Sequence, residues 1–337
     1  RSAFSWLRLL RPETPSEVSQ EYFRGDVSDR FVTMHRFLSG HFPQSCVESS
    51  GVVDVPHAAV LLDPWLLNYG HWSSMGLSRI AALAELLAKP QEAVEIRVLT
   101  YGTRFALEAL RLLGVEADRI IIADHCCWYR LGRAYFAGPR AWVRRDNLSR
   151  KSGLRIRGLW LDSARAEHPG LVASLQTVDR PVALALDRGR DDVRRFATRA
   201  LANFGPLLRI LRGVVRRIGG QAAAYVCGEH SFAEQVVAFS EADLALGVDG
   251  GCVANALWMR PGATVLSLVP VREDYFPMPV KTCGTFPGWR IGDSVGVRPV
   301  ALLLPEAGFK DPFVTAPPRV VRAALEAWVA SWAAAAA

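Results

Sequence analysis

Residues 231–270 read SFAEQVVAFSEADLALGVDGGCVANALWMRPGATVLSLVP, and this stretch contains the most informative pattern of the chain. The pattern predicts a helix, a short apolar strand, a glycine turn at Gly250 and Gly251, a second helix, and a strand after a Pro-Gly turn. A glycine turn that opens a helix at the end of a strand is where α/β proteins hold phosphates, because backbone N–H groups and the helix dipole point at the ligand. We therefore expect an α/β fold with an anion-binding turn at residues 249–255.

The same alternation of strands and helices extends from this stretch toward both ends of the chain. Expected strands are residues 58–62, 94–99, 120–123, 182–186 and 222–227, with a further short strand near 134–136. Expected helices are residues 70–88, 104–113 and 206–218. Strands separated by helices predict βαβ units with largely parallel sheets.

Three domains follow from the changes in composition. Residues 162–180 are polar and contain a Pro-Gly pair, so they predict a junction between an N-terminal α/β domain, 1–165, and a C-terminal Rossmann-like domain, 180–316. The remaining segment, 317–337, predicts a helix with a single apolar stripe. The stripe consists of Val321, Leu325, Trp328 and Trp332. We expect this helix to pack back on the N-terminal domain.

Composition excludes several classes of protein. The chain has 337 residues, of which 50% are hydrophobic and 22% charged, so it has ample material for a globular core. It contains no uninterrupted apolar stretch of about 18 residues, which predicts no transmembrane span. The net charge is +7, but no dense basic tract with interleaved aromatic residues appears, so we expect no nucleic-acid partner.

The cysteine pattern predicts no metal site. The six cysteines, at 46, 126, 127, 227, 252 and 283, form no CxxC pair, and we expect them to be buried free thiols. Asp124, His125, Cys126 and Cys127 are consecutive, and adjacent residues of a strand point to opposite faces, so they do not converge on one ion.

The N-terminal segment leaves the compartment open. Residues 1–12 contain arginine and serine and no acidic residue, which is typical both of an organelle transit segment and of an ordinary amphipathic helix. A mitochondrial, a cytoplasmic and an endomembrane-lumen location all remain open.

Three patches of sequence, in order along the chain, resemble the motifs of one enzyme family. Residues 68–72 read NYGHW and are followed by Arg79, residues 187–190 read DRGR, and residues 231–270 follow a pattern of S-F-x-E-Q, apolar strand, H-G-A-G-L-x-N and x-M-x-P-G. Together they resemble glycosyltransferase family 61 over about residues 67–270.

This resemblance implies a fold and a reaction. The implied fold is of the GT-B type, with two Rossmann-like domains facing a cleft. The implied activity is inverting transfer of a hexosyl or pentosyl group from a nucleotide sugar, such as a UDP-sugar, to a glycan acceptor, without a metal ion or another cofactor. Protein groups alone must then neutralise the leaving diphosphate, and arginines and helix N-termini are suited to this.

The resemblance also assigns candidate residues. The nucleotide-binding candidates are Arg188, Arg190, Glu234, Asp249, Gly250, Gly251 and Asn255, and the catalytic candidate is His71. Other interpretations stay open for several of them. The arginines pair equally well with Asp187, Asp191 or Asp192 on a solvated turn. Ser231 and Glu234 fit a helix capping box, and a histidine beside a tryptophan is more often packed than catalytic.

Three departures from the family pattern bear on activity. Met75 stands where the family commonly has an acid four residues after its histidine, and a thioether is no proton acceptor. Asp249 replaces the histidine of H-G-A-G. Repulsion between a carboxylate and a diphosphate about 5 Å away weakens binding of the diphosphate by roughly 3 kcal/mol, or about a hundredfold in affinity. Cys252 replaces a glycine of the turn and restricts the approach of the backbone.

Three hypotheses follow. The favoured one is a catalytically degenerate family relative that serves as a binding or scaffold subunit of a larger assembly with protein partners. The alternative is an active inverting enzyme in which Asp63, Asp124 or Glu229 is the base. A metabolite-binding enzyme of another α/β class ranks last, because no G-x-G-x-x-G follows a first strand.

Overall fold

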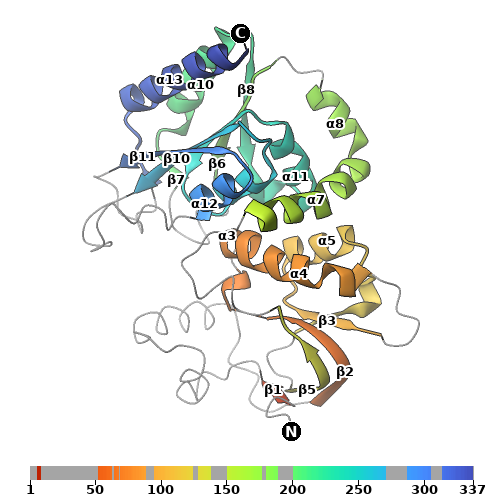
Figure 1. The fold of residues 1–337 in the computed structure, drawn as a ribbon. Coiled ribbons are helices and arrows are strands. Elements are labelled where there is room, and N and C mark those ends of the chain that lie inside the picture. Colours follow the sequence, from red (N-terminus) through yellow and green to blue (C-terminus); the bar gives the residue numbers. More distant parts are fainter. Residues whose placement is uncertain are drawn as a thin grey trace. The chain divides into compact units, whose positions relative to one another are not determined.

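A computed structural model describes residues 6–8, 52–62, 64–67, 69–88, 95–123, 128–137, 150–176, 180–188, 200–270, 287–304 and 313–336. The chain divides into two compact units (Figure 1). The first unit comprises Arg1–Leu67 and Ala82–Gly138, and the second comprises Asn68–Ala81 and Pro139–Ala337. The mixed α/β class predicted from the sequence is confirmed.

The first unit contains a five-stranded sheet. Its strands are β1 (Trp6–Arg8), β2 (Val52–Leu61), β3 (Arg97–Thr100), β4 (Ile120–Ile122) and β5 (Trp128–Tyr135), in the order β1-β5-β2-β3-β4. All neighbours are parallel except β1, which pairs antiparallel with β5. The helical elements are η2 (Pro64–Leu67), the end of α4 (Leu77–Ala88), α5 (Arg104–Leu112) and η4 (Ala117–Arg119). Val60, Leu99 and Tyr129 belong to the core of this sheet.

The second unit contains a five-stranded parallel sheet. Its strands are β6 (Val182–Asp187), β8 (Gln221–Val226), β9 (Leu244–Val248), β10 (Thr264–Pro270) and β11 (Arg298–Leu304), in the order β11-β10-β9-β6-β8. A separate pair joins β7 (Ala200–Leu201) and β12 (Phe313–Val314). Numbered along the chain, the sheet has the doubly wound order 2-1-3-4-5.

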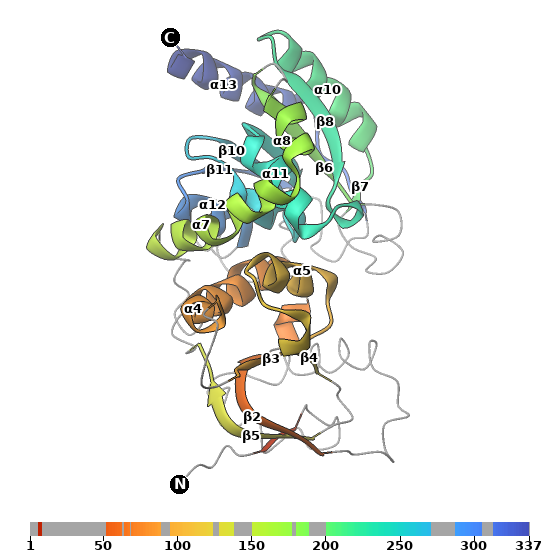
Figure 2. The same cartoon turned by 90° about the vertical axis from the view of Figure 1, so that its right-hand side faces the viewer.

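Helices accompany this sheet. They are α7 (Arg150–Glu167), α8 (Pro169–Gln176), α10 (Phe204–Arg216), α11 (Phe232–Glu241), α12 (Pro287–Ser294) and α13 (Pro318–Ala336), with the short elements α3 (Tyr69–His71), η3 (Trp72–Gly76), η5 (Cys227–Glu229) and η6 (Cys252–Trp258). Helices α10 and α13 lie side by side on one face of the sheet, and α7, α11 and α12 lie on the other (Figures 1 and 2).

Burial on both faces explains the apolar strands. All residues of β10 are buried, as are most of β6 and β9, which is expected of parallel strands covered by helices on both sides. Alternate residues such as Leu244 and Leu246 pack with Leu211 of α10, and their neighbours face the opposite layer. The buried strands therefore fix the positions of their ends and of the turns that follow them.

Two regions differ from the sequence prediction. Residues 162–180, predicted as a polar junction, contain the end of α7 and all of α8, and both helices belong to the second unit. The apolar stripe of α13, predicted to pack on the N-terminal domain, packs in the structure against α10. Leu207 and Leu211 of α10 supply the apolar surface for Val321, Leu325 and Trp328, so the stripe is buried within its own unit.

Candidate functional site

A small pocket lies at the carboxyl ends of β6 and β9, two adjacent strands of the second sheet. The chain leaves β6 toward α10 on one face of the sheet and leaves β9 toward η6, which packs with α11 and α12 on the other. Such a reversal is the topological switch point where open α/β sheets bind their ligands. The pocket is lined by Leu186, Asp187, Arg188, Leu201, Val248, Gly250, Gly251 and Cys252.

Two acidic residues follow neighbouring strands at this end of the sheet. Asp187 ends β6 opposite Val226 of β8, so Glu229 follows three residues later on the neighbouring strand end. Burial raises the pKa of the Asp187 carboxyl, the Arg188 backbone N–H opposes that shift, and the charge of Glu229 raises the pKa further. The ionised form of Asp187 is thus disfavoured at the pocket wall.

The glycine turn is where the sequence places it, but the helix after it is short. Residues 252–258 form a 3-10 helix, η6, instead of the α-helix that the sequence predicts. Asp249 is buried at 2% exposure, its N–H donates to the Leu268 carbonyl, and its side chain is not part of the pocket lining. Gly251 has an ordinary helical φ of −54°, so its conformation does not require glycine.

Asn255 is fully buried and joins four elements. Its Oδ1 accepts a hydrogen bond from the Tyr69 hydroxyl at 2.5 Å, and its Nδ2 donates to Gln235 Oε1 at 2.8 Å. Gln235 in turn donates to the backbone carbonyls of Cys227 and His230. The carboxamide predicted to bind a nucleotide therefore connects α3, η5, η6 and α11 inside the protein.

Glu234 occupies the third position of α11 in a complete capping box. Its N–H donates to Ser231 Oγ, and its own carboxylate accepts from the Ser231 N–H at 2.7 Å. These bonds lower the pKa of the Glu234 carboxyl, helped by His230 and His168. The capping interpretation of S-x-x-E is confirmed, and the carboxylate is still about one third exposed.

The structure brings the three sequence patches together. Tyr69 reaches Asn255, and Trp72 packs edge to face on Phe232 at 5.4 Å, so the first patch contacts the signature region. Arg188 of the second patch shares the pocket with Gly250 and Gly251. The backbone of His71 lies in α3. Arg190, Asp63 and Asp124 lie outside the described residues, so their predicted roles stay predictions.

Cys227 and Cys252 form a disulfide, which corrects the prediction of free thiols at these two positions. Their Cα atoms are 5.9 Å apart and the residues are 25 apart in sequence. They pair because the ends of β8 and β9 lie at the same edge of the sheet. In the described part of the chain, no three histidine, cysteine or acidic residues gather in a way that would hold a metal ion.

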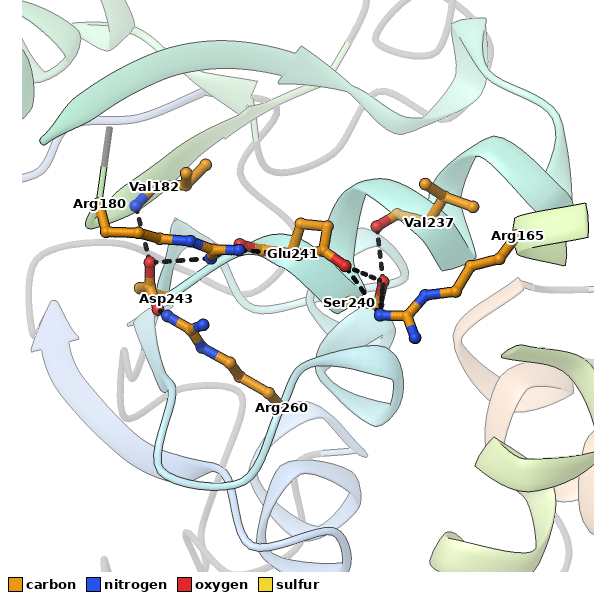
Figure 3. Close-up of polar contacts among 8 residues, drawn as sticks. All are labelled: Arg165, Arg180, Val182, Val237, Ser240, Glu241, Asp243 and Arg260. Atoms are coloured by element: carbon orange, nitrogen blue, oxygen red, sulfur yellow. Dashed lines mark hydrogen bonds and ion pairs between the residues drawn. The ribbon is translucent and has the colours of Figure 1, made fainter. Parts of the chain in front are cut away.

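The opposite edge of the same sheet has a network of charges (Figure 3). Asp243, which precedes β9, is completely buried and pairs with Arg180 and Arg260, and it also accepts the Val182 N–H at 2.8 Å. Glu241 pairs with Arg180 at 2.7 Å and with Arg165 at 2.8 Å. This network ties the starts of β6 and β9 to α7 and to the turn before β10.

Sequence reasoning missed several residues of this region. From the sequence, Asp187 is expected only as an ion-pair partner, Gln235 and Tyr69 only as positions of the family motifs, and the pairing of Cys227 with Cys252 is not expected. Gln235 directly follows the capping box in the S-x-x-E-Q motif, so its position in this motif is a signal that the sequence contains. A spacing of 25 residues between two cysteines carries no such signal, because only the strand order brings them together.

Comparisons with known proteins add one finding. The family model described as glycosyltransferase 61 matches residues 69–266, which is more than half of the chain. The search of curated proteins found no match to the chain. Within the described residues, every helix is too short or too polar to cross a membrane.

Proposed function

The chain belongs to glycosyltransferase family 61, and on that premise we propose that it is a member without sugar-transfer activity, retained as a binding or scaffold subunit. In this proposal the two units are the Rossmann-like domains of a GT-B arrangement. The pocket at the ends of β6 and β9 corresponds to the donor side, with Arg188, Gly250 and Gly251 at the diphosphate position. The assembly then includes protein partners in addition to any nucleotide sugar or glycan.

The charge around the pocket is the observation that carries this proposal. Its described lining has one guanidinium, that of Arg188, and one carboxyl group, that of Asp187. The charge of Glu229 also raises the pKa of the Asp187 carboxyl, so a second acidic group acts on this part of the pocket. A nucleoside diphosphate needs a surplus of positive charge when no metal ion is used, and this lining does not supply one.

The size of the pocket supports the same conclusion. Its volume is about 20 Å³, which is room for about one water molecule. Pockets that hold metabolites or nucleotides have volumes of roughly 300–1,000 Å³. The described turn thus leaves too little space for a diphosphate in this conformation.

The residue at the expected position of the general base also supports inactivity. Met75 lies in the π-helical turn η3, one turn after His71, where the family commonly has an acid. A thioether cannot accept the proton of an acceptor hydroxyl. Loss of a positioned base typically reduces a rate by 10²–10⁴-fold.

An active inverting transferase is the second candidate, and one observation favours it. Burial and the charge of Glu229 raise the pKa of the Asp187 carboxyl at the pocket wall, and a carboxyl group with a raised pKa in a pocket is typical of acid–base sites. In this alternative Glu229 is the base that takes the place of the missing acid.

A transfer assay distinguishes the inactive family member from the active transferase. The purified chain is incubated with UDP- and GDP-sugars and glycan acceptors, and release of the nucleoside diphosphate is measured. The proposal predicts release no faster than in a blank without protein. Release that is lost in Arg188→Ala and Glu229→Gln, but kept in the exposed control Arg216→Ala on α10, would establish the active enzyme instead.

A further inference from the structure

The layer of α10 and α13 in the second unit carries a basic surface. The two helices lie side by side and bury apolar residues such as Leu211 and Leu325, which leaves their other sides to solvent (Figures 1 and 2). Six exposed arginines lie there, and Arg209, Arg212 and Arg216 recur at the spacing of one helix side. The six are Arg209, Arg212, Arg216, Arg217, Arg319 and Arg322, and we call this surface the basic face.

Contacts between the two helices make the basic face one continuous surface. Asn203, which caps the start of α10, donates to the Ala316 carbonyl at 2.7 Å and accepts the Ala316 N–H at 3.2 Å, so α10 and α13 begin next to each other. At the end of α10, Arg217 pairs with Glu326 of α13 at 3.2 Å. Both helices are therefore fixed to each other at two places along their length, and their arginines keep a constant arrangement.

Acidic residues are scarce on the basic face. Residues 203–221 contain no aspartate or glutamate, and the sequence of α13 contains a single one, Glu326. Within the described residues, the arginines of the basic face other than Arg217 have no carboxylate partner. The helices on the opposite face of the sheet differ, because α7 carries Asp162 and Glu167 among its basic residues and α11 carries two acidic residues and no basic one. Like charges held side by side repel one another, and an anionic partner relieves that repulsion.

The residues between the arginines decide which anion fits. They are small, so the long arginine side chains project from a low surface; the exposed ones are Gly205, Gly213, Ala323, Ala327 and Ala330. Charges that project together from such a surface match an anion that is itself extended and flat. Single-stranded nucleic acids are instead held by aromatic side chains on which their bases stack, and none of the exposed residues described on α10 and α13 is aromatic.

Exposed apolar side chains at the border of the basic face favour a lipid surface. Val320, next to Arg319 in the first turn of α13, is 47% exposed. Phe313, in the strand β12 that precedes this helix, is 58% exposed. An apolar side chain gains nothing from a phosphate or a carboxylate, whereas it is stabilised at the boundary between the headgroups and the acyl chains of a bilayer. Basic and apolar groups side by side therefore fit an anionic membrane better than an acidic peptide.

We propose that the basic face binds the surface of a lipid bilayer that contains anionic phospholipids. The guanidinium groups contact the headgroup phosphates and carboxylates, and Val320 contacts the acyl boundary. Each basic residue held near an anionic bilayer contributes roughly fivefold in affinity, so the arginines without carboxylate partners suffice for peripheral binding. The proposal goes beyond the proposed function and does not depend on it, because the pocket at the ends of β6 and β9 takes no part.

The test is cosedimentation of the full chain with vesicles of phosphatidylcholine and with vesicles of phosphatidylcholine mixed with phosphatidylserine. We expect the affinity for the mixed vesicles to be higher by about tenfold or more, and to fall as sodium chloride is added, because salt screens exposed charges. The variant Arg209→Glu/Arg212→Glu/Arg216→Glu should lose about tenfold or more of the affinity for the mixed vesicles.

A matched control separates the basic face from the net charge of the chain. Arg150→Glu/Lys151→Glu/Arg155→Glu changes three exposed residues of α7, on the other face of the sheet, and alters the net charge by the same amount. This variant should bind the mixed vesicles like the native chain. Val320→Ser should lower the affinity by roughly threefold and leave its salt dependence unchanged, since it removes apolar contact and no charge.

Three results overturn the proposal: equal affinity for both kinds of vesicle, an equal loss in the α7 control, or binding to a polyglutamate peptide through the same arginines without binding to the mixed vesicles. The last result would assign the basic face to an acidic protein. Urea denaturation checks that each variant is folded. Should the α10 variant be unstable, Arg319→Glu/Arg322→Glu tests the same face near the start of α13, where the helix dipole favours acidic side chains.

Discussion

The two edges of the second sheet use charge in opposite ways. At the amino ends of β6 and β9, each buried carboxylate has guanidinium partners, and Asp243 accepts a backbone N–H as well. At the carboxyl ends of the same strands, burial raises the pKa of the Asp187 carboxyl, and the charge of Glu229 raises it further. The paired charges at the amino ends stabilise the fold, whereas the surroundings of Asp187 at the carboxyl ends disfavour ionisation of its carboxyl group.

This difference distinguishes a structural end of the sheet from the end that is the candidate ligand site. A carboxylate with several partners in a dry interior is typical of a structural network, and its removal leaves uncompensated charges. A desolvated carboxyl group at a topological switch point is typical of a ligand site. The sequence contains arginines at both edges, so only the partners tell the two roles apart.

The largest expected effect is at the amino edge. Asp243→Ala leaves Arg180 and Arg260 without their shared carboxylate and the Val182 N–H without an acceptor. We expect a loss of about 3–5 kcal/mol in the free energy of unfolding, measured by urea denaturation. Glu326→Ala removes the exposed partner of Arg217 and should cost less than about 1 kcal/mol. Equal losses in both variants would contradict the structural role of the network.

The next effect is that of the disulfide at the carboxyl edge. Removing a covalent link between residues 25 apart lowers stability by about 3–4 kcal/mol, because the unfolded chain gains conformational freedom. Urea denaturation of the oxidised and the reduced chain measures this difference. The Cys227→Ser/Cys252→Ser variant should show the same loss and no further change on reduction. A reductant effect that persists in this variant would mean that another cysteine pair is responsible.

A smaller effect is expected at Asn255. Asn255→Ala removes the acceptor of the Tyr69 hydroxyl bond and the donor to Gln235 Oε1, which costs about 2 kcal/mol in the free energy of unfolding. Tyr69→Phe removes one of these bonds and should cost about 1 kcal/mol. Asn255→Ala with unchanged stability would show that the carboxamide is not structural and would return it to the ligand-binding candidates.

The smallest effect is at the cap of α11, and it depends on pH. Ser231→Ala should cost about 1 kcal/mol at pH 7. The pKa of Glu234 is lowered in the folded chain, so its contribution is fully present above its unfolded pKa of about 4.5 and is lost as the pH falls through the folded value. The stability difference between the native chain and Glu234→Gln should therefore shrink below about pH 4.5. A difference that stays constant down to pH 3 would contradict the cap.

Local patterns predicted much of the second unit. The alternation of apolar runs and amphipathic helices predicted β6, α10, β8, α11, β9 and β10 within a few residues, since these elements are buried on regular faces. The S-x-x-E pattern predicted the capping box at Ser231 because both partners are local in sequence. The same patterns fail at residues 162–180, where they predict a junction although the residues belong to α7 and α8 and the polar side chains lie on the exposed side of these helices.

The candidate site was less predictable, because its geometry depends on contacts between distant residues. Arg188, Gly250 and Gly251 line one pocket, and their predicted role in binding a nucleotide stays a prediction. Asn255 was expected at a ligand, but it lies between Tyr69, 186 residues away, and Gln235. The pairing of Cys227 with Cys252 required the strand order β9-β6-β8, which no local pattern contains.

The proposal that the pocket at the ends of β6 and β9 does not bind a sugar donor is tested most directly by a thermal-shift screen. The purified chain, with its disulfide intact, is screened against UDP- and GDP-sugars at millimolar concentration. We expect no stabilisation by any donor beyond that of a salt control, because the pocket is small and the described part of its lining carries no surplus positive charge. A ligand present at 100 times its Kd would stabilise the fold by about 2.7 kcal/mol, which is readily seen. Stabilisation by one donor that is lost in Arg188→Ala and kept in Arg216→Ala would contradict the account.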